Sequence, residues 1–326
     1  MIEALALLSA VSLALSVNAN ATERAAPTTD EQSRNLAREL VQIELNEGSV
    51  GNLEPLERAI SLSISTTLAS GNPTLQSALA ANVEKQLTPL EAKFTGALTD
   101  AYSKDLTASE MRRIVDFMRG PGGQAEAANL PILKSKLASG QAMEPNAVAK
   151  MEAATDLAYR RAPQARRDLI ERIFKAQNFE EHTRQDFQKL YSRLNTAVSA
   201  ATDALSNSKG KSSSATTPSD NVESDKEVEA DVRRTMAIEK SFYLTHFTDG
   251  ELGIIATYLE SDAGQALLTQ LPEIQKTVGS KILTKLDDLM PGVMAAACAT
   301  AKCTDDQRDK LKQRLGVMQQ VLHATL

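Results

Sequence analysis

The sequence predicts an all-α protein made of two tandem helical repeats, a pseudo-duplicated helical bundle, followed by a C-terminal helix. Three observations predict this fold class. Apolar residues recur every three or four positions along most of the chain, which is the spacing of the buried side of a helix. No segment alternates convincingly between apolar and polar residues, as a half-buried strand would. A stretch that begins at residue 101 recurs at residue 242, as expected for an internal repeat.

The composition is that of a globular protein, with 24% charged and 42% hydrophobic residues among 326. Thirty-six basic side chains stand against 42 acidic ones, which gives a net charge of -6. The basic residues do not cluster anywhere. This pattern excludes a nucleic-acid partner that requires a basic surface.

The amino terminus resembles a signal peptide. Ala4 to Val17 are fourteen residues without a charge, too few for a bilayer span of about 20 apolar residues. Ala19 and Ala21 offer cleavage sites, so we expect residues 1–21 to be a signal peptide and the protein to be periplasmic or secreted, with no membrane span after cleavage. Glu3 stands where a positive charge is usual, which leaves the natural start open. The alternative is a buried amino-terminal helix, which also accounts for an apolar run without a polar face.

The repeat is clearest between Tyr102 and Pro131, which match residues 243–272 at a constant offset of 141. Nine of these thirty positions are identical, where chance gives about two. The identical pairs are Tyr102/Tyr243, Thr107/Thr248, Glu110/Glu251, Ile114/Ile255, Gly123/Gly264, Gln124/Gln265, Ala125/Ala266, Leu130/Leu271 and Pro131/Pro272.

A second match sets the predicted boundaries. Residues 38–41 (RELV) resemble residues 167–170 (RDLI) at an offset of 129, which is 12 less than 141. We therefore expect extra residues in the second copy, in the flexible Ser-rich insertion 206–221. The predicted units are copy one at 33–150, copy two at 160–290 and a C-terminal helical segment at 291–326.

Runs of apolar residues spaced three or four positions apart predict the helices of each copy. In copy one the apolar positions are Leu36, Leu40 and Ile43, then Leu53, Leu56, Ile60 and Ile64, then Leu75, Leu79, Val83, Leu87, Leu90, Phe94, Leu98 and Tyr102. In copy two they are Phe187, Leu190, Leu194 and Val198, then Val228, Val232, Met236 and Phe242. Each run predicts a helix with one buried face.

The repeated stretch predicts a short helix and the start of a third. Thr107 with Glu110, and Thr248 with Glu251, have the spacing of a capping box, which opens a helix. The first short helix should end at Gly120-Pro121-Gly122-Gly123 and the second near Ser261. Gln124 and Gln265 should enter the next helix, and Pro131 and Pro272 suit a break or the first turn of a third helix.

Cys298 and Cys303 predict a structural disulfide, because an exported protein meets an oxidising compartment. Residues five apart on one helix point away from each other, so the bridge requires a turn between them. Thr304 and Gln307 have the form of a capping box that opens a new helix after such a turn. Free thiols remain the alternative, and a metal site would need more ligands than two cysteines.

The repeated pattern resembles that of a secreted bacterial family, domain of unknown function 2059. Copy two is the better match, through Tyr243, Phe247, Thr248, Glu251, Leu252, Tyr258, Gly264, Gln265 and Pro272, whereas copy one has Leu106, Met111 and Phe117 at three of these positions. The resemblance covers the two repeated stretches and their upstream helices. It implies an exported, helical, periplasmic protein, and it supplies no catalytic residues.

Residues suited to catalysis or metal binding are few. His182 follows Glu180 and Glu181, and Asp186 lies one turn further on, so two or three metal ligands could share a helix face. Solvent-exposed polarity explains this group better than a metal site. His246 has Asp105 at the matching position of copy one, and His323 stands alone. The SxxK string at 206–209 lies in the Ser-rich insertion, and the GPGG string at 120–123 follows a helix rather than a strand, so we assign neither a role.

Two functions remain open. The favoured one is a non-catalytic periplasmic binding or scaffolding module for envelope proteins or peptides, a class that includes holdases, without a cofactor or metal. The alternative is an envelope hydrolase or other enzyme that uses Glu110 or Glu251 as acid or base. The candidate binding residues are the repeated Tyr102, Glu110, Gln124, Tyr243, Glu251 and Gln265.

Overall fold

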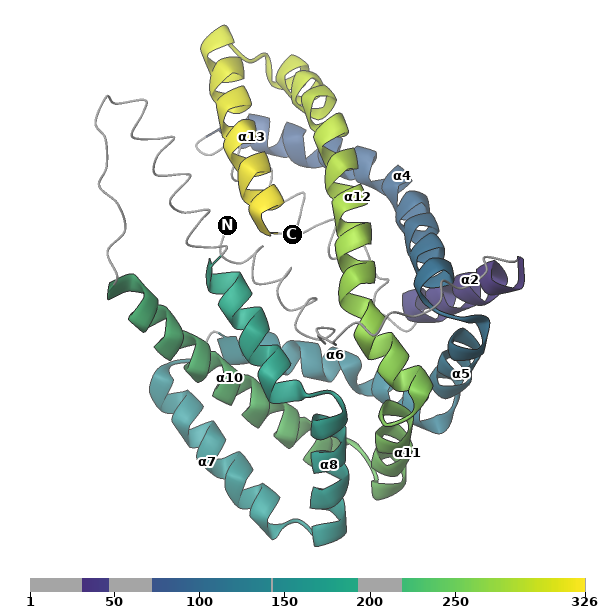
Figure 1. Cartoon of the computed structure of the whole chain (residues 1–326). Helices are drawn as coiled ribbons and strands as arrows, with labels where there is room; N and C mark the ends of the chain where they lie inside the picture. Colours follow the sequence, from purple (N-terminus) through teal and green to yellow (C-terminus); the bar gives the residue numbers. More distant parts are fainter. Residues whose placement is uncertain (1–30, 47–71, 142, 193–218, 326) are drawn as a thin grey trace.

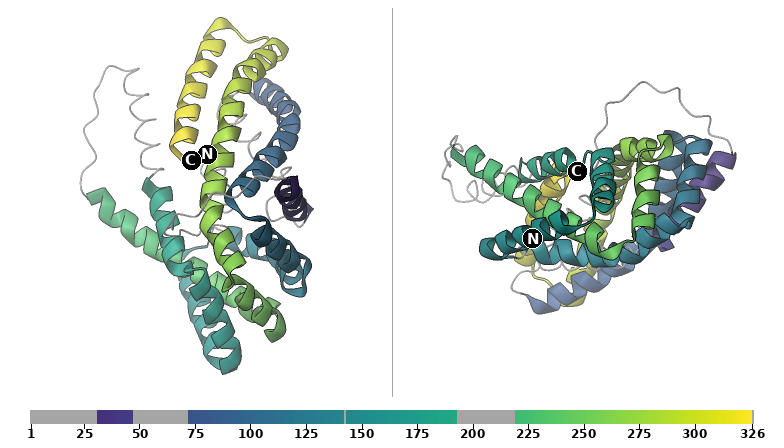
Figure 2. Two further views of the ribbon diagram at one scale, coloured as in Figure 1. Left: turned by 45° about the vertical axis from the view of Figure 1, so that its right-hand side comes forward. Right: turned by 90° about the horizontal axis from the view of Figure 1, so that it is seen from below.

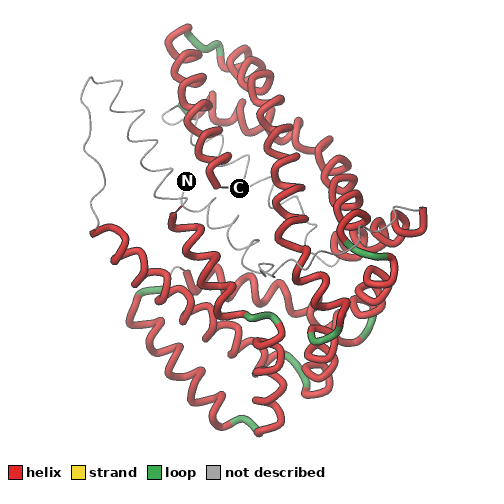
Figure 3. The backbone as a smooth tube through the Cα atoms, in the orientation of Figure 1, coloured by secondary structure: helices red, strands yellow, loops and turns green. Residues whose placement is uncertain are grey.

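The computed structural model describes residues 31–46, 72–141, 143–192 and 219–325, and within them all regular structure is helical (Figure 1, Figure 3). The prediction of an all-α fold is therefore confirmed. None of the helices in the described part of the chain is long and apolar enough to cross a membrane.

The helices follow one another with short connections. They are α2 (Glu31–Asn46), α4 (Pro73–Asp105), α5 (Ala108–Arg119), α6 (Pro121–Gln141), α7 (Pro145–Arg161), α8 (Gln164–Ala176), α10 (Ser219–His246), α11 (Asp249–Leu259), α12 (Asp262–Ala301) and α13 (Asp305–Thr325). Residues 179–192 form a further helical stretch before the second gap.

Several predictions fall outside these ranges. The expected signal peptide, residues 1–21, and the apolar positions from Leu53 to Ile64 lie outside the described residues. So does the Ser-rich insertion up to residue 218, while its last three residues, 219–221, already belong to α10.

The predicted boundaries do not coincide with helix ends. α12 runs without interruption from Asp262 to Ala301, so the boundary at 290 falls inside it and the separate C-terminal helix is α13. The boundary at 150 falls inside α7.

The prediction that Pro131 and Pro272 break a helix or lie in its first turn is wrong. Pro131 lies well inside α6, and Pro272 lies well inside α12. A proline in a helix loses one backbone hydrogen bond. Packing outweighs this loss, since buried side chains follow within two turns of each proline: Leu133 and Leu137 in α6, and Ile274 and Val278 in α12.

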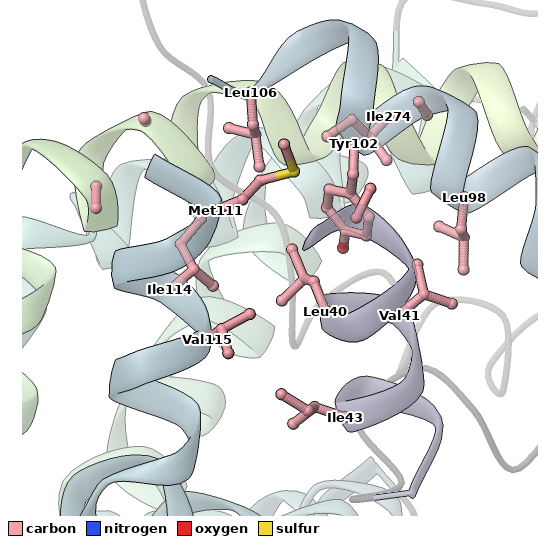
Figure 4. Close-up of a cluster of buried hydrophobic side chains, with 14 of the residues drawn as sticks. Leu40, Val41, Ile43, Leu98, Tyr102, Leu106, Met111, Ile114, Val115 and Ile274 are labelled. Carbon is pink, nitrogen blue, oxygen red and sulfur yellow. The ribbon is translucent and has the colours of Figure 1, made fainter. Parts of the chain in front are cut away.

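A first core joins α2, α4, α5 and the first part of α12 (Figure 4). Its fully buried side chains include Leu40, Tyr102, Leu106, Met111 and Ile114. Each buried aliphatic chain of this size stabilises the fold by about 1.5 to 3 kcal/mol.

A second core joins α8, α10, α11 and α6, with Ile170, Ile173, Leu252 and Ile255 fully buried. The helix that follows each short helix therefore packs on the opposite set: α6 lies against α10 and α11, and α12 lies against α4 and α5. This exchange ties the two sets of helices together, and α12 runs alongside α4 in both views of Figure 2.

The contacts of α2 and α8 correspond at a sequence offset of 133 rather than the predicted 129. Arg119 pairs with Glu39 at 2.5 Å, and Glu260 pairs with Arg172 at 2.6 Å. The offsets between these two ion pairs are 260 minus 119, or 141, and 172 minus 39, or 133. The buried positions agree, since adding 133 to the numbers of Ala37, Leu40 and Val41 gives the buried Ile170, Ile173 and Phe174.

The structural offset of 133 and the sequence offset of 129 differ by four residues, about one helical turn. Apolar residues recur at this spacing along an amphipathic helix, so a match shifted by one turn still aligns apolar positions. The second set of helices then carries eight extra residues, 141 minus 133, rather than 12.

The far ends of α4 and α12 form a third core with α13. Leu75, Leu79 and Val83 of α4 pack against α12 residues from Leu286 to Cys298 and against Leu311 and Leu315. α12 ends at Ala301, and the next residue, Lys302, has a left-handed backbone with φ 52. Cys298 and Cys303 are paired across this turn with Cα atoms 4.9 Å apart. The predicted disulfide and its turn are both confirmed, as are the capping bonds between Thr304 and Gln307.

Candidate binding surface on helix α11

Both short helices open with the predicted capping box. The backbone N–H groups of Thr107 and Thr248 donate to Glu110 and Glu251 Oε2 at 2.8 and 2.7 Å. The Thr hydroxyls accept from the Glu backbone N–H at 3.2 Å in each case. The backbone N–H and the hydroxyl of Thr248 both donate to Glu251 Oε2 and hold the pKa of Glu251 below its usual value. The two repeated glutamates thus act as helix caps.

The repeated Gly-Gln pairs close the turns that follow. A Cβ on Gly123 would overlap with Met118 Cα, and one on Gly264 would overlap with the carbonyl oxygen of Tyr258. Only glycine permits this approach of one helix start to the preceding helix end. Gln124 and Gln265 then donate from Nε2 to the carbonyl oxygens of Met118 and Leu259, at 3.1 and 2.6 Å.

The repeated tyrosines lie in the two cores. Tyr102 is fully buried and its hydroxyl donates to Glu44 Oε1 at 2.8 Å. Burial and the Glu44 charge raise the pKa of Tyr102 well above its usual value. Tyr243 is 6% exposed and lies beside the side chain of Gln177, which corresponds to Glu44 at the offset of 133. The six candidate binding residues are thus placed at caps, turns and cores, and the structure does not bring them together in one site.

The two short helices meet through one pair of equivalent aromatic residues. The rings of Phe117 on α5 and Tyr258 on α11 stack with centroids 3.7 Å apart and planes 3° from parallel. These two residues match at the offset of 141. The inner sides of α5 and α11 therefore pack through matching residues. The pairs Met111/Leu252 and Ile114/Ile255, which are fully buried, show the same.

The outward faces of α5 and α11 differ sharply. On α5 the face carries Ser109, Arg112, Arg113 and Asp116, none of them buried. The matching positions on α11 are Gly250, Gly253, Ile254 and Thr257. We call these four residues the α11 face. Ile254 is 41% exposed, and the α11 face carries no charge, whereas three of the four matching residues on α5 are charged.

The fold does not require the two glycines of the α11 face. A Cβ on Gly253 would meet only Leu169 Cδ2 at 4.0 Å, and one on Gly250 only Thr248 Oγ1 at 3.9 Å, both ordinary contacts. Glycine inside a helix is less favourable than alanine by about 1 kcal/mol. These glycines therefore weaken α11 without any packing need, in contrast to Gly123 and Gly264.

An open depression of about 530 Å³ follows the α11 face, lined by Gly250, Gly253, Ile254, Thr257, Tyr258 and Ser261. All six residues belong to α11 and the turn after it. Figure 1 places α11 at the lower edge of the molecule, between α8 and α5. None of the residues predicted from the sequence lies on the α11 face, although the loss of charge between the matching positions of α5 and α11 is a signal for it.

The histidines do not form a metal site in the described part of the chain, where no group of three His, Cys, Asp or Glu side chains could hold an ion. The expectation that His182 is exposed is wrong. It is 4% exposed, and its Nδ1 lies 2.5 Å from the carbonyl oxygen of Gln177, because the chain turns at residues 177–178 and folds the ring inward. His246 Nε2 lies 3.1 Å from Lys136 Nζ, and burial followed by this charge lowers the pKa of His246.

In comparisons with known proteins, no family model, no curated protein and no solved structure matches the chain.

Proposed function

We propose that the protein is an exported, non-catalytic binding or scaffolding module of the bacterial envelope, and that the α11 face contacts an apolar segment of a partner polypeptide. One observation carries this proposal: α11 keeps two glycines that packing does not require, beside the exposed Ile254. Glycines one turn apart let another backbone approach the helix closely, and an exposed apolar side chain supplies the contact.

The form of the surface supports a polypeptide rather than a small molecule. A small-molecule site encloses most of its ligand between several elements. The depression on α11 is open and lined from one helix and its following turn. A helix or extended segment laid across α11 would cover Gly250, Gly253 and Ile254 together.

The proposed cellular location is inferred from the sequence. Residues 1–21 have the pattern of a signal peptide, and the Cys298–Cys303 pair suits an oxidising compartment. Membership in the domain of unknown function 2059 family, and a periplasmic location, belong to this proposal. We also propose that the corresponding contacts of the two sets of helices derive from two tandem copies, which the matching ion pairs Glu39–Arg119 and Arg172–Glu260 support.

The enzyme alternative is less well supported. A general acid must hold a proton near neutral pH, whereas the capping bonds hold the pKa of Glu251 below its usual value. Glu110 makes the same bonds to Thr107. Either carboxylate would have to abandon a helix cap to act on a substrate.

Site-specific photo-crosslinking in cells tests the proposal. A photoreactive residue at Thr257, and separately at the matched position Asp116 on α5, would be activated in intact cells. The crosslinked products would then be recovered from the periplasmic fraction and identified by mass spectrometry. We expect one or two envelope proteins to be captured from position 257 and not from 116.

The identified partner must then lose affinity for the Gly253→Arg/Ile254→Arg variant, which gives α11 the residues of α5. Equal capture from both positions, or undiminished binding of this variant, would contradict the assignment of the α11 face. Absence of the protein from the periplasmic fraction would contradict the address.

A further inference from the structure

Arginines gather where α7 meets α8. Residues 160–167 (RRAPQARR) contain four arginines and no acidic residue. α7 ends at Arg161 and α8 begins at Gln164, and this connection lies at the lower end of the molecule in Figure 1. We call residues 157–167 the α7–α8 tip. The prediction that basic residues do not cluster anywhere is wrong here, because a turn of two residues brings the two arginine pairs together.

The matching turn between α12 and α13 has no net charge. α8 begins at residue 164 and α13 at residue 305, which is again the offset of 141. Residues 160–167 therefore correspond to residues 301–308 (AKCTDDQR), whose two basic and two acidic side chains cancel. Asp305 and Asp306 lie in the first turn of α13, where the positive end of a helix favours acids. α8 has Gln164 and Ala165 at these positions, so a helix start does not require the charge of the tip.

Three of the four arginines have no carboxylate partner. Arg166 pairs with Asp249 of α11. Arg160 and Arg161 are exposed, and their side chains form no hydrogen bond or ion pair within the described part of the chain. Arg167 donates to the carbonyl oxygen of Arg160 at 2.7 Å, so its charge is held beside theirs without being neutralised.

The acids nearest in sequence are engaged by uncharged donors or unpaired. Asp168 accepts from Gln164 Nε2, and Glu171 accepts from the hydroxyl of Tyr159, each at 2.6 Å. Asp156 is exposed and forms no ion pair with any of the described residues. The tip therefore presents cations that direct contacts within the protein leave available.

Apolar side chains accompany these cations. Leu157 lies one turn before Arg161 on the same side of α7. It is 50% exposed, more than any other large hydrophobic side chain of the described residues. Pro163 and Ala165 are exposed in the turn and at the start of α8. Basic and apolar groups that project together are typical of a surface that meets anionic lipids.

We propose that the α7–α8 tip binds the surface of a membrane that contains anionic lipids, with Arg160 and Arg161 at the lipid phosphates and Leu157 beside the acyl chains. The tip is a turn between two helices at the end of the molecule, whereas polypeptide ligands use grooves and sheet edges. A projecting turn reaches a flat lipid surface without hindrance from the rest of the fold. This binding does not depend on the α11 face, so it stands whether or not that face binds a partner.

The overall charge of -6 does not prevent this contact. At physiological salt, charges further apart than about 8 Å are largely screened, so acids elsewhere on the molecule oppose it weakly. Each basic side chain at an anionic bilayer strengthens binding about fivefold. Arg160 and Arg161 together should therefore strengthen binding by more than about tenfold.

Sedimentation of the full protein with lipid vesicles at about 0.15 M salt tests the tip. The anionic vesicles contain phosphatidylethanolamine and phosphatidylglycerol, and the neutral ones contain phosphatidylcholine alone. We expect Arg160→Gln/Arg161→Gln to lower the affinity for anionic vesicles at least about tenfold. Leu157→Ala should lower it by about threefold. On neutral vesicles the arginine variant should bind as the unchanged protein does.

Arg112→Gln/Arg113→Gln on α5 is the matched control. These two arginines are also adjacent, exposed and without an ion pair in the described part of the chain. Removing them changes the net charge by the same amount as removing Arg160 and Arg161. We expect this control to change the affinity for anionic vesicles by less than about twofold.

Three results would contradict the proposal. Equal loss in both arginine variants would show that binding follows overall charge and not the tip. Equal affinity of both variants and the unchanged protein for anionic vesicles would show that the tip does not contact lipid. Retention of the protein by poly-glutamate that Arg160→Gln/Arg161→Gln abolishes, without any effect of this variant on vesicle binding, would assign the tip to an acidic polypeptide instead.

Discussion

Helices α5 and α11, each with its capping box and following turn, form two corners of the molecule. The two corners are built alike inside and differ in the chemistry of their outward side chains. Each begins with a Thr-Glu capping box, buries a Met or Leu and an Ile, and ends at a Gly-Gln turn. Three of the four outward residues are charged on α5, whereas the four on α11 are small or apolar. The shared residues are those that the fold requires, so the difference is where a function specific to one corner is to be sought.

A second difference lies in the interior, where the buried Leu98 of the first core corresponds, at the offset of 141, to Glu239 of α10, which is 5% exposed. Leu98→Glu should break this contrast with the largest effect, because it places an unpaired carboxyl at a 4% exposed position. We expect a loss of stability of about 3 kcal/mol or more at pH 8, and a smaller loss at pH 5 where the acid is neutral. Denaturant unfolding at the two pH values measures it, and an equal loss at both would contradict the account.

The Gly-Gln turns should respond alike at both corners. Gly123→Ala and Gly264→Ala each place a methyl group closer than 3.0 Å to backbone atoms. Each should destabilise the protein by about 2 to 3 kcal/mol, since backbone must move to relieve the overlap. Equilibrium unfolding checks this, and a neutral result at one corner would show that the two turns are not built alike.

The capping boxes should also contribute equally. Thr107→Ala and Thr248→Ala each remove the hydroxyl that accepts from the Glu backbone N–H at 3.2 Å. A loss of about 1 kcal/mol is expected in each case. Because the Glu251 carboxylate depends on Thr248, the cap should weaken as the pH falls through the lowered pKa of Glu251. A difference of more than about 1 kcal/mol between the variants would count against equal construction.

The smallest effect has opposite signs at the two corners. Gly253→Ala should stabilise α11 by up to about 1 kcal/mol, because nothing closer than 4.0 Å meets the new methyl group. Arg112→Gly at the matched position of α5 should destabilise by about as much. Thermal unfolding compares them. If Gly253→Ala destabilises instead, the glycine serves the fold and the argument for a binding role is lost.

The local parts of the structure could be predicted from the sequence. The capping boxes, the turn between Cys298 and Cys303 and the helical stripes depend on residues within a few positions of each other, where residue type decides the geometry. The helix breaks predicted at Pro131 and Pro272 do not occur. Burial of side chains further along α6 and α12 outweighs the one backbone hydrogen bond that each proline removes. The short match at 129 differs from the structural offset because one helical turn nearly restores the apolar pattern.

The long-range features could not be predicted. The exchange of α6 and α12 between the two cores depends on contacts between helices far apart in the chain, which periodicity does not encode. His182 becomes buried through a turn whose Asn178 has a positive φ of 46. The sequence does not show which glycines pack against backbone atoms. The structure shows that Gly123 and Gly264 do and that Gly250 and Gly253 of the α11 face do not.

The most direct test of the central claim is an exchange of the two outward faces. Two variants would be compared for binding to the partner identified by crosslinking: Gly253→Arg/Ile254→Arg on α11, and Arg112→Gly/Arg113→Ile on α5. We predict that the α11 variant loses at least about tenfold in affinity, equal to about 1.4 kcal/mol, while the α5 variant binds as the unchanged protein does. Equal affinity of both variants, or loss only in the α5 variant, would contradict the assignment of binding to α11.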